Sequence, residues 1–140
     1  MSECVFCKIM EGKIPSSKVY SDDNNLAFLD ISPANKGHVI VIPKNHVETI
    51  SELPDTDLVS LMKVVRKVSK ALLDEFDGVN VLQNNKIAAG QFVPHLHFHV
   101  IPRNSGDGLE LAHWKPLKYA DGKMQEYQDR IVTVLLSEVI

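Results

Sequence analysis

The order of apolar and polar residues along the chain predicts one long helix near its middle. Apolar side chains recur there at spacings of three and four, which is typical of a helix with one face turned to a core. They are Leu58, Leu61, Met62, Val65, Val68 and Leu72. Asp55 and Asp57 follow Pro54 in the expected first turn, where negative charge suits the helix dipole. We therefore predict an amphipathic helix from Pro54 to about Asp77.

Short apolar runs on either side of this helix predict strands. The runs are 18–20, 26–30, 38–42, 79–83 and 93–101. Turn-forming residues at 21–25 separate the first two, so we expect a hairpin there. The third run is β-branched and lies between Gly37 and Pro43, which predicts a largely buried strand. A short helix at 5–10 and an amphipathic helix at about 121–138 complete the expected elements.

Strands that group in hairpins, with helices segregated from them, are typical of an α+β domain around an antiparallel sheet. The chain has 140 residues, and 44% of them are hydrophobic, which is enough to form an ordinary core. No repeat, low-complexity segment or linker divides it. We therefore expect a single domain over residues 1–140, with the helix at about 121–138 as an extension.

Charge and composition limit the classes of partner. The formal net charge is -3 and the sequence pI is about 6.0, so there is no general basic field, and we expect no nucleic-acid partner. No apolar run is long enough to span a membrane, and the N-terminus lacks the charged and apolar regions of a signal peptide. We expect a soluble, cytoplasmic protein with no membrane partner.

The strongest chemical signal is a row of three histidines in the last strand. His95, His97 and His99 alternate with apolar residues, and in an extended strand that spacing puts all three on one face. A row of imidazoles serves packing poorly, because each neutral ring needs both a donor and an acceptor. The pattern therefore favours function, as a metal site or as histidine nucleophile and acid–base chemistry.

The chain contains two cysteines, Cys4 and Cys7, in a C-x-x-C pair. Such a pair is either a redox motif or half of a zinc site. A thioredoxin-like motif needs a preceding strand, and only three residues precede Cys4. The sequence therefore favours a metal, provided that two further ligands exist.

Together, these patterns resemble the histidine triad (HIT) family of nucleotide-binding hydrolases and transferases, in its Hint-like branch with a zinc-binding C-x-x-C. The run 95–101 fits the family signature His-apolar-His-apolar-His followed by apolar residues. The segments 27–33 and 38–46 and the pair Gly90-Gln91 match in order and spacing, so the resemblance covers about 5–114. It implies the HIT-type fold, a five-stranded antiparallel sheet with one long helix and a short N-terminal helix. The C-terminal helix expected from the apolar spacing lies outside the resemblance and adds to this fold.

The resemblance also implies the catalytic groups. His97, the middle histidine, would attack the α-phosphorus of a nucleotide and become transiently nucleotidylated, with a backbone carbonyl fixing its tautomer. His99 would bind the phosphate or the bridging atom. Gln91 and Asn84 would hydrogen-bond around the α-phosphate.

The resemblance also implies which residues bind the nucleoside. Asp30 resembles the carboxylate that accepts hydrogen bonds from ribose hydroxyls, and four apolar residues resemble the walls around the base. These are Phe6, Ile9, Phe28 and Ile31. Without the family, all four would be interpreted as core.

By the same resemblance, His46 and His95 would join Cys4 and Cys7 in a structural Zn²⁺ site with one ion per chain. Related galactose-1-phosphate uridylyltransferases use such a set. A surface position for His46 is the alternative. For His38 and His113 we favour structural or surface roles, although His113 would approach a neighbouring site if the C-terminal segment folds over it.

The implied activity is hydrolysis of purine nucleoside 5′-phosphoramidates or related adenosine 5′-phosphate derivatives, including dinucleoside polyphosphates, by a homodimer that binds AMP-type nucleotides. The alternatives are a nucleotidyltransferase or phosphorylase, a nucleotide-sensing binding module, and a catalytic metal site at the triad, which lacks nearby carboxylates. One residue departs from the pattern. Many relatives have Ser or Thr after Gly-Gln, whereas this chain has Phe92, which has no hydroxyl for the leaving group.

Overall fold

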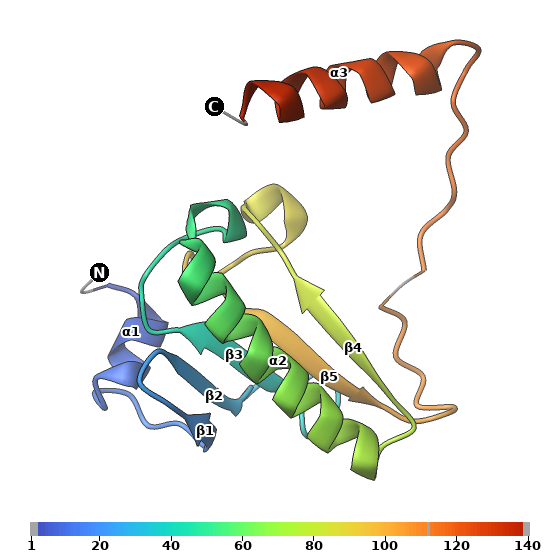
Figure 1. The fold of residues 1–140 in the computed structure, drawn as a ribbon. Helices are drawn as coiled ribbons and strands as arrows, with labels where there is room; N and C mark the ends of the chain where they lie inside the picture. The colour runs from blue at the N-terminus through green and yellow to red at the C-terminus, as the bar shows by residue number, and fades with distance from the viewer. Residues whose placement is uncertain (1–2, 112, 139–140) are drawn as a thin grey trace. The chain divides into compact units, whose positions relative to one another are not determined.

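The computed structural model describes residues 3–111 and 113–138, and it confirms the α+β fold with a five-stranded antiparallel sheet. The strand order is β1-β2-β3-β5-β4, so the triad strand β5 lies between β3 and β4 (Figure 1). The elements are α1 (Val5–Met10), β1 (Lys18–Ser21), β2 (Asn25–Leu29), β3 (Val39–Pro43), α2 (Asp55–Glu75), β4 (Gly78–Gln83), β5 (Phe98–Arg103) and α3 (Lys123–Ser137), with 3-10 turns η1 (Ile50–Glu52) and η2 (Ile87–Ala89).

The two faces of the sheet have different partners. Val39 and Val41 of β3 and Phe98 of β5 pack in one core cluster with the buried stripe of α2. The alternate residues Ile40 and Ile42 pack in a second cluster that includes α1. Because side chains alternate along a strand, His97 and His99 share the face of α1. The face that carries the histidines is therefore opposite the one covered by α2.

The last strand begins later than the sequence predicts. We expected it from Val93, but β5 starts at Phe98. Pro94 has no N–H to donate, and the N–H of Leu96 bonds the carbonyl of Val47, 2.7 Å away, in place of a neighbouring strand. Alternation continues through this irregular stretch, since Leu96 packs in the same cluster as Phe98. His95 thus lies on a loop, and His97 directly precedes the strand.

The chain divides after Leu109 into two compact units. In the second unit, helix α3 begins at Lys123, and Gly122 is its N-cap residue. The apolar stripe of α3 is exposed within that unit, and so is His113, which we had considered as a possible neighbour of the site. No helix within residues 3–111 and 113–138 combines the length and the apolar character needed to cross a membrane.

Candidate functional site

Four predicted metal ligands converge at the start of α1. The ligand atoms of Cys4, Cys7, His46 and His95 all lie within 4.8 Å of one another. Cys4 Sγ lies 3.4 Å from His95 Nδ1, and Cys7 Sγ lies 3.3 Å from His46 Nδ1. His95 is fully buried, and its Nε2–H donates to the Pro43 carbonyl at 2.9 Å. That hydrogen bond leaves the Nδ1 lone pair directed at the other three ligands.

These distances fit a tetrahedral cation. Zinc bonds of ordinary length separate a sulfur and a nitrogen ligand by about 3.5 Å and two nitrogen ligands by about 3.3 Å. Here the His46 and His95 Nδ1 atoms are 3.0 Å apart, and Cys7 Sγ is 3.7 Å from His95 Nδ1. His95 Nδ1 has a single lone pair and cannot accept a hydrogen bond from all three neighbouring ligand atoms, whereas a central cation can bind all four. Without a cation, burial and the adjacent Cys4 raise the pKa of Cys7 to about 11.

The middle histidine is held in one tautomer. His97 Nδ1–H donates to the carbonyl oxygen of His95 at 2.7 Å, which confirms the backbone carbonyl expected at this ring. The proton is therefore on Nδ1, and Nε2 keeps its lone pair. Burial lowers the pKa of His97 below its ordinary value, so the ring is neutral near pH 7. A neutral imidazole with a free Nε2 lone pair is a competent nucleophile.

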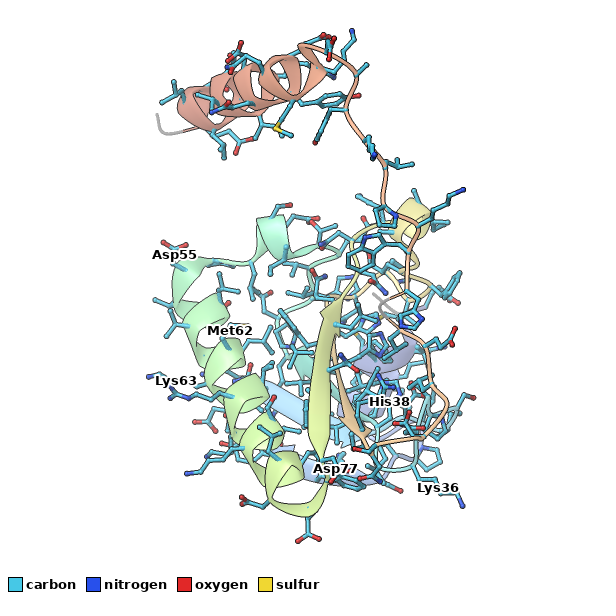
Figure 2. All side chains as sticks on the ribbon, turned by 90° about the vertical axis from the view of Figure 1, so that its right-hand side faces the viewer. Lys36, His38, Asp55, Met62, Lys63 and Asp77 are labelled. Atoms are coloured by element: carbon cyan, nitrogen blue, oxygen red, sulfur yellow. The ribbon has the colours of Figure 1, made fainter. Side chains whose placement is uncertain are left out.

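His38, for which we expected a structural or surface role, is buried and contacts the triad directly. The Ala34 N–H donates to His38 Nδ1 at 3.0 Å, so the His38 proton is on Nε2. That Nε2–H donates to His99 Nδ1 at 2.9 Å, which places the His99 proton on Nε2. Two hydrogen bonds, the first donated by a backbone amide, therefore fix the tautomers of His38 and then of His99. Figure 2 shows His38 on the side of the sheet away from α2.

The result is a ring with a free Nε2 lone pair, His97, beside a ring with an Nε2–H donor, His99. The ring centroids of His97 and His99 are 4.9 Å apart. Burial and the neighbouring histidines lower the pKa of His99 to about 4, so the ring is a neutral donor. Asp30 Oδ2 lies 3.7 Å from His38 Nε2. Asp30, His38 and His99 are also close enough to bind a metal, but the proton on His38 Nε2 occupies the nitrogen that would ligate.

The four residues expected to surround the base differ in exposure. Phe6, Ile9 and Phe28 are buried in one core cluster, and the Phe6 ring contacts His97 edge-on with centroids 5.0 Å apart. Their burial favours the core interpretation that the sequence left open. Ile31 is 94% exposed and lies outside that cluster, next to Asp30. Of these four residues, Ile31 alone presents exposed apolar surface, while the Phe6 ring packs against the His97 ring.

Gln91 bridges two loops beside the triad. Its side chain is 3% exposed, and its Oε1 accepts from the Lys86 N–H at 2.7 Å. Its Nε2 donates to the Glu48 carbonyl at 2.7 Å. Both ends of the amide are therefore used to join the loop after β4 to the loop after β3. Asn84 begins the same loop and lies close to Gly90, where an added Cβ would be 3.6 Å from Asn84 Nδ2.

Lys86 has the one positive φ among the non-glycine residues of the described chain. Its φ of 72° and ψ of 161° fall in a region that is essentially reserved for glycine and costs about 1–3 kcal/mol for other residues. The conformation is maintained by the Gln91 side chain on its N–H and by two N–H groups on its carbonyl, from Ala89 and Gln91. Strain is therefore stored in the loop that leads to the triad.

Replacing Lys86 with glycine should stabilise the protein, because glycine adopts this conformation without steric cost. We expect the free energy of unfolding to rise by about 1 kcal/mol, which corresponds to a higher Tm of about 3 °C. Lys86→Ala is the matched control, since it also removes the exposed ion pair with Glu48 but keeps a Cβ. Equal Tm values for the glycine and alanine variants would show that the strain is absent.

Phe92, where the chain departs from the family pattern, is 86% exposed. It lines a surface cleft of about 490 Å³ with Cys4, His46 and Glu48, among other residues. The ring is therefore not part of the core, and it lies on the same side as the metal ligands. The sequence alone did not reveal this cleft, because its residues come from three separate segments of the chain.

Comparison with known proteins identifies a family and several relatives. The family model described as HIT domain matches residues 11–106. An uncharacterized HIT-like protein of Methanocaldococcus jannaschii is 49% identical over 119 residues, covering 84% of this chain and 92% of its own. An adenosine 5′-monophosphoramidase of Schizosaccharomyces pombe is 49% identical over 100 residues, covering 71% of this chain and 74% of its own.

Solved structures show the same fold. The crystal structure of a HIT family member from Bacillus subtilis has a TM-score of 0.85 and 43% identity, and the match covers 94% of this chain and 96% of that one. A Zn-bound histidine triad family protein from Mycobacterium smegmatis has a TM-score of 0.74 and 32% identity, with 99% of both chains covered. Because the Mycobacterium smegmatis protein is zinc-bound and has a similar fold, its structure bears on the four-ligand cluster found here.

Proposed function

This chain belongs to the histidine triad (HIT) family, and on that premise we propose that it hydrolyses purine nucleoside 5′-phosphoramidates or related adenosine 5′-phosphate derivatives through a nucleotidyl-histidine intermediate. The observation that carries the proposal is the hydrogen bond from His97 Nδ1–H to the His95 carbonyl. It leaves Nε2 free to attack, in a ring whose pKa is lowered by burial. The name of the S. pombe relative supports an adenosine 5′-phosphate derivative as substrate.

The reaction has two displacements at the same phosphorus. His97 Nε2 attacks the α-phosphorus, a P–N bond to the histidine forms, and the bond from phosphorus to the leaving group breaks. The His99 Nε2–H, oriented through His38, donates a hydrogen bond to the departing atom. Water then attacks the phosphorus, the bond to His97 breaks, and AMP leaves. Asp30 accepts hydrogen bonds from the ribose, and Asn84 hydrogen-bonds the α-phosphate. Both ends of the Gln91 amide are used between the two loops, so Gln91 acts by holding the main chain beside the phosphate.

We further propose that the four-ligand cluster binds Zn²⁺ as a structural ion, one per chain. The set of two thiolates and two imidazoles is the donor set that zinc prefers in closed sites, and the distances fit it. No ligand position remains for substrate. The ion therefore supplies stability and not chemistry, and His95 serves the metal while His97 and His99 serve the reaction.

We propose that the working form is a homodimer in the cytoplasm, with residues 1–140 as one HIT domain and α3 as its extension. β4 is an edge strand of the sheet, and its Val81 and Leu82 are exposed apolar residues that a second copy would cover. The thiols of Cys4 and Cys7 are free, which suits a reducing compartment. Light scattering that gives the mass of one chain would reject the dimer.

A turnover panel tests the activity and separates it from its rivals. Adenosine phosphoramidate, diadenosine polyphosphates and nucleotide sugars are each incubated with the full chain, with and without phosphate. We expect AMP release from the phosphoramidate, independent of phosphate. Release of nucleoside diphosphate that depends on phosphate would establish a transferase instead. AMP binding without turnover of any substrate would establish a nucleotide-sensing module.

Phe92→Ser should change the preference for the leaving group. A phenyl ring cannot donate a hydrogen bond to a departing amine, whereas a hydroxyl can. We expect kcat for phosphoramidates to rise about tenfold, or about 1.4 kcal/mol, and kcat for polyphosphate substrates to rise much less. Steady-state kinetics on both substrate classes measures the ratio.

Phe92→Ala is the matched control, since it removes the ring without supplying a hydroxyl. Because Phe92 is exposed, neither variant should lower the Tm. A uniform loss of rate on all substrates together with a lower Tm would assign Phe92 to loop packing and reject the leaving-group role.

A further inference from the structure

The two cysteines are positioned for a second kind of chemistry. Cys4 is the N-cap of α1, and its sulfur accepts the Cys7 N–H at 3.4 Å. Two residues separate the cysteines, so both sulfurs lie on one helical turn, within the four-ligand cluster. The two sulfurs lie within 4.8 Å of each other, and a disulfide bond would bring them to about 2 Å.

The cysteines are buried, but a reactant has a route to them. Cys4 lines the surface cleft of about 490 Å³ together with His46, Glu48 and Phe92. A hydroperoxide is small enough to enter such a cleft. Metal-bound thiols are deprotonated, and the thiolate is the form that reacts with peroxides.

The four-ligand cluster and helix α1 both contact His97, the nucleophile of the proposed function. His95 supplies a ligand atom, and its main-chain carbonyl accepts the hydrogen bond that fixes the His97 tautomer at 2.7 Å. Phe6 lies between the two cysteines in α1, and its ring contacts both His97 and His95, with centroids 5.0 and 5.8 Å away. Phe6 is therefore the side chain through which a change in the Cys4–Cys7 turn would reach the His97 ring.

We propose that Cys4 and Cys7 form a reversible disulfide on reaction with a hydroperoxide, that the disulfide releases the metal, and that His97 loses its fixed orientation as a result. With hydrogen peroxide, the Cys4 thiolate attacks one peroxide oxygen, the S–O bond forms and the O–O bond breaks, giving a sulfenic acid and hydroxide. The Cys7 thiolate then attacks the Cys4 sulfur, forming the S–S bond and expelling a second hydroxide. Two electrons pass from the sulfurs to the peroxide, and two protons convert the hydroxides to water.

The experiment uses the full chain loaded with zinc and treated with one equivalent of hydrogen peroxide. Zinc release is followed with a chromogenic chelator, and the mass of the intact chain is measured in parallel. We expect one zinc released for each chain that loses two hydrogens, and full reversal by dithiothreitol with added zinc. Peptide mapping excludes oxidation of the four methionines. Zinc retained after the two hydrogens are lost, or cysteines that end as sulfinic acids, would overturn the proposal.

The link to His97 is tested without substrate. Long-range ¹H–¹⁵N spectra of the histidine rings report the protonated nitrogen, and we expect His97 to show a single Nδ1–H tautomer when reduced and a mixture when oxidised. The control is reduced protein freed of zinc by a chelator, which separates metal loss from the disulfide. An unchanged His97 tautomer in the oxidised protein would reject the coupling.

Nucleotide binding adds a second readout, which rests on the proposed function. We expect the Kd for AMP to rise about tenfold on oxidation, within the range usual for coupled sites. A protein that binds no AMP in either state would contradict the proposed function, while zinc release and the His97 spectra would still decide the disulfide. An unchanged Kd in a protein that does bind AMP would show that oxidation does not regulate the site.

Discussion

Replacing His97 with alanine is expected to lower kcat by several orders of magnitude while AMP still binds. The imidazole forms a covalent bond in the reaction, and losing a nucleophile removes the two-step route altogether. Single-turnover kinetics with adenosine phosphoramidate measures the loss. The same assay on the wild-type chain should trap a nucleotidyl group on His97, detectable by mass spectrometry after an acid-free quench.

Two measurements keep this result interpretable. The His97 ring is buried against Phe6, so a Tm and an AMP titration must show that the alanine variant is folded. His113→Ala is a control for a histidine that is exposed and lies in the second unit, and it should leave the rate unchanged. Turnover within tenfold of wild type in a folded His97→Ala protein would reject the covalent mechanism.

Removal of zinc should have the largest effect on stability. Ligands from α1, the loop after β3 and the loop before β5 meet in the cluster, so an ion bound there links three segments in the folded state alone. When the free concentration of the ion is about one thousand times its Kd, binding stabilises the fold by about 4 kcal/mol. We expect chelation to lower the free energy of unfolding by that order, measured by urea titration with and without added zinc.

Cys4→Ser isolates the metal from the helix cap. Serine is itself a good N-cap, so α1 keeps its capping hydrogen bond while the ion loses a thiolate. We expect about one zinc per wild-type chain, less in the variant, and a fall in Tm of similar size after chelation of the wild-type protein or after the substitution. If the freshly purified wild-type protein contained no zinc and had the same Tm as the Cys4→Ser variant, the cluster would not be a metal site.

The parts of this site that the sequence predicts are those encoded by local periodicity. Alternation along 95–100 places the three histidines opposite Leu96, Phe98 and Val100, and the structure packs those three apolar residues in the α2 core. Residue type and spacing also identified the C-x-x-C pair as half of a metal site. Its partners His46 and His95 were implied only by the family resemblance, and the structure brings all four ligand atoms within 4.8 Å of one another.

The parts that escaped prediction depend on pairing between distant segments. His38 contacts His99 because β3 and β5 pair with Ile40 opposite His99, a register that no local pattern reports. The late start of β5 depends in the same way on the N–H of Leu96 bonding the Val47 carbonyl. The strain at Lys86 is equally invisible in the sequence, since lysine is not a residue that indicates a positive φ.

The central place of β5 also has a consequence for biosynthesis. β5 pairs with β3 on one side and β4 on the other, yet among the strands of the described residues it is the last to leave the ribosome. Until it emerges, β3 and β4 of the nascent chain both have unpaired edges, which favour association with other chains. Because β5 closes this gap and carries His99, completing the sheet and completing the site are the same event during translation.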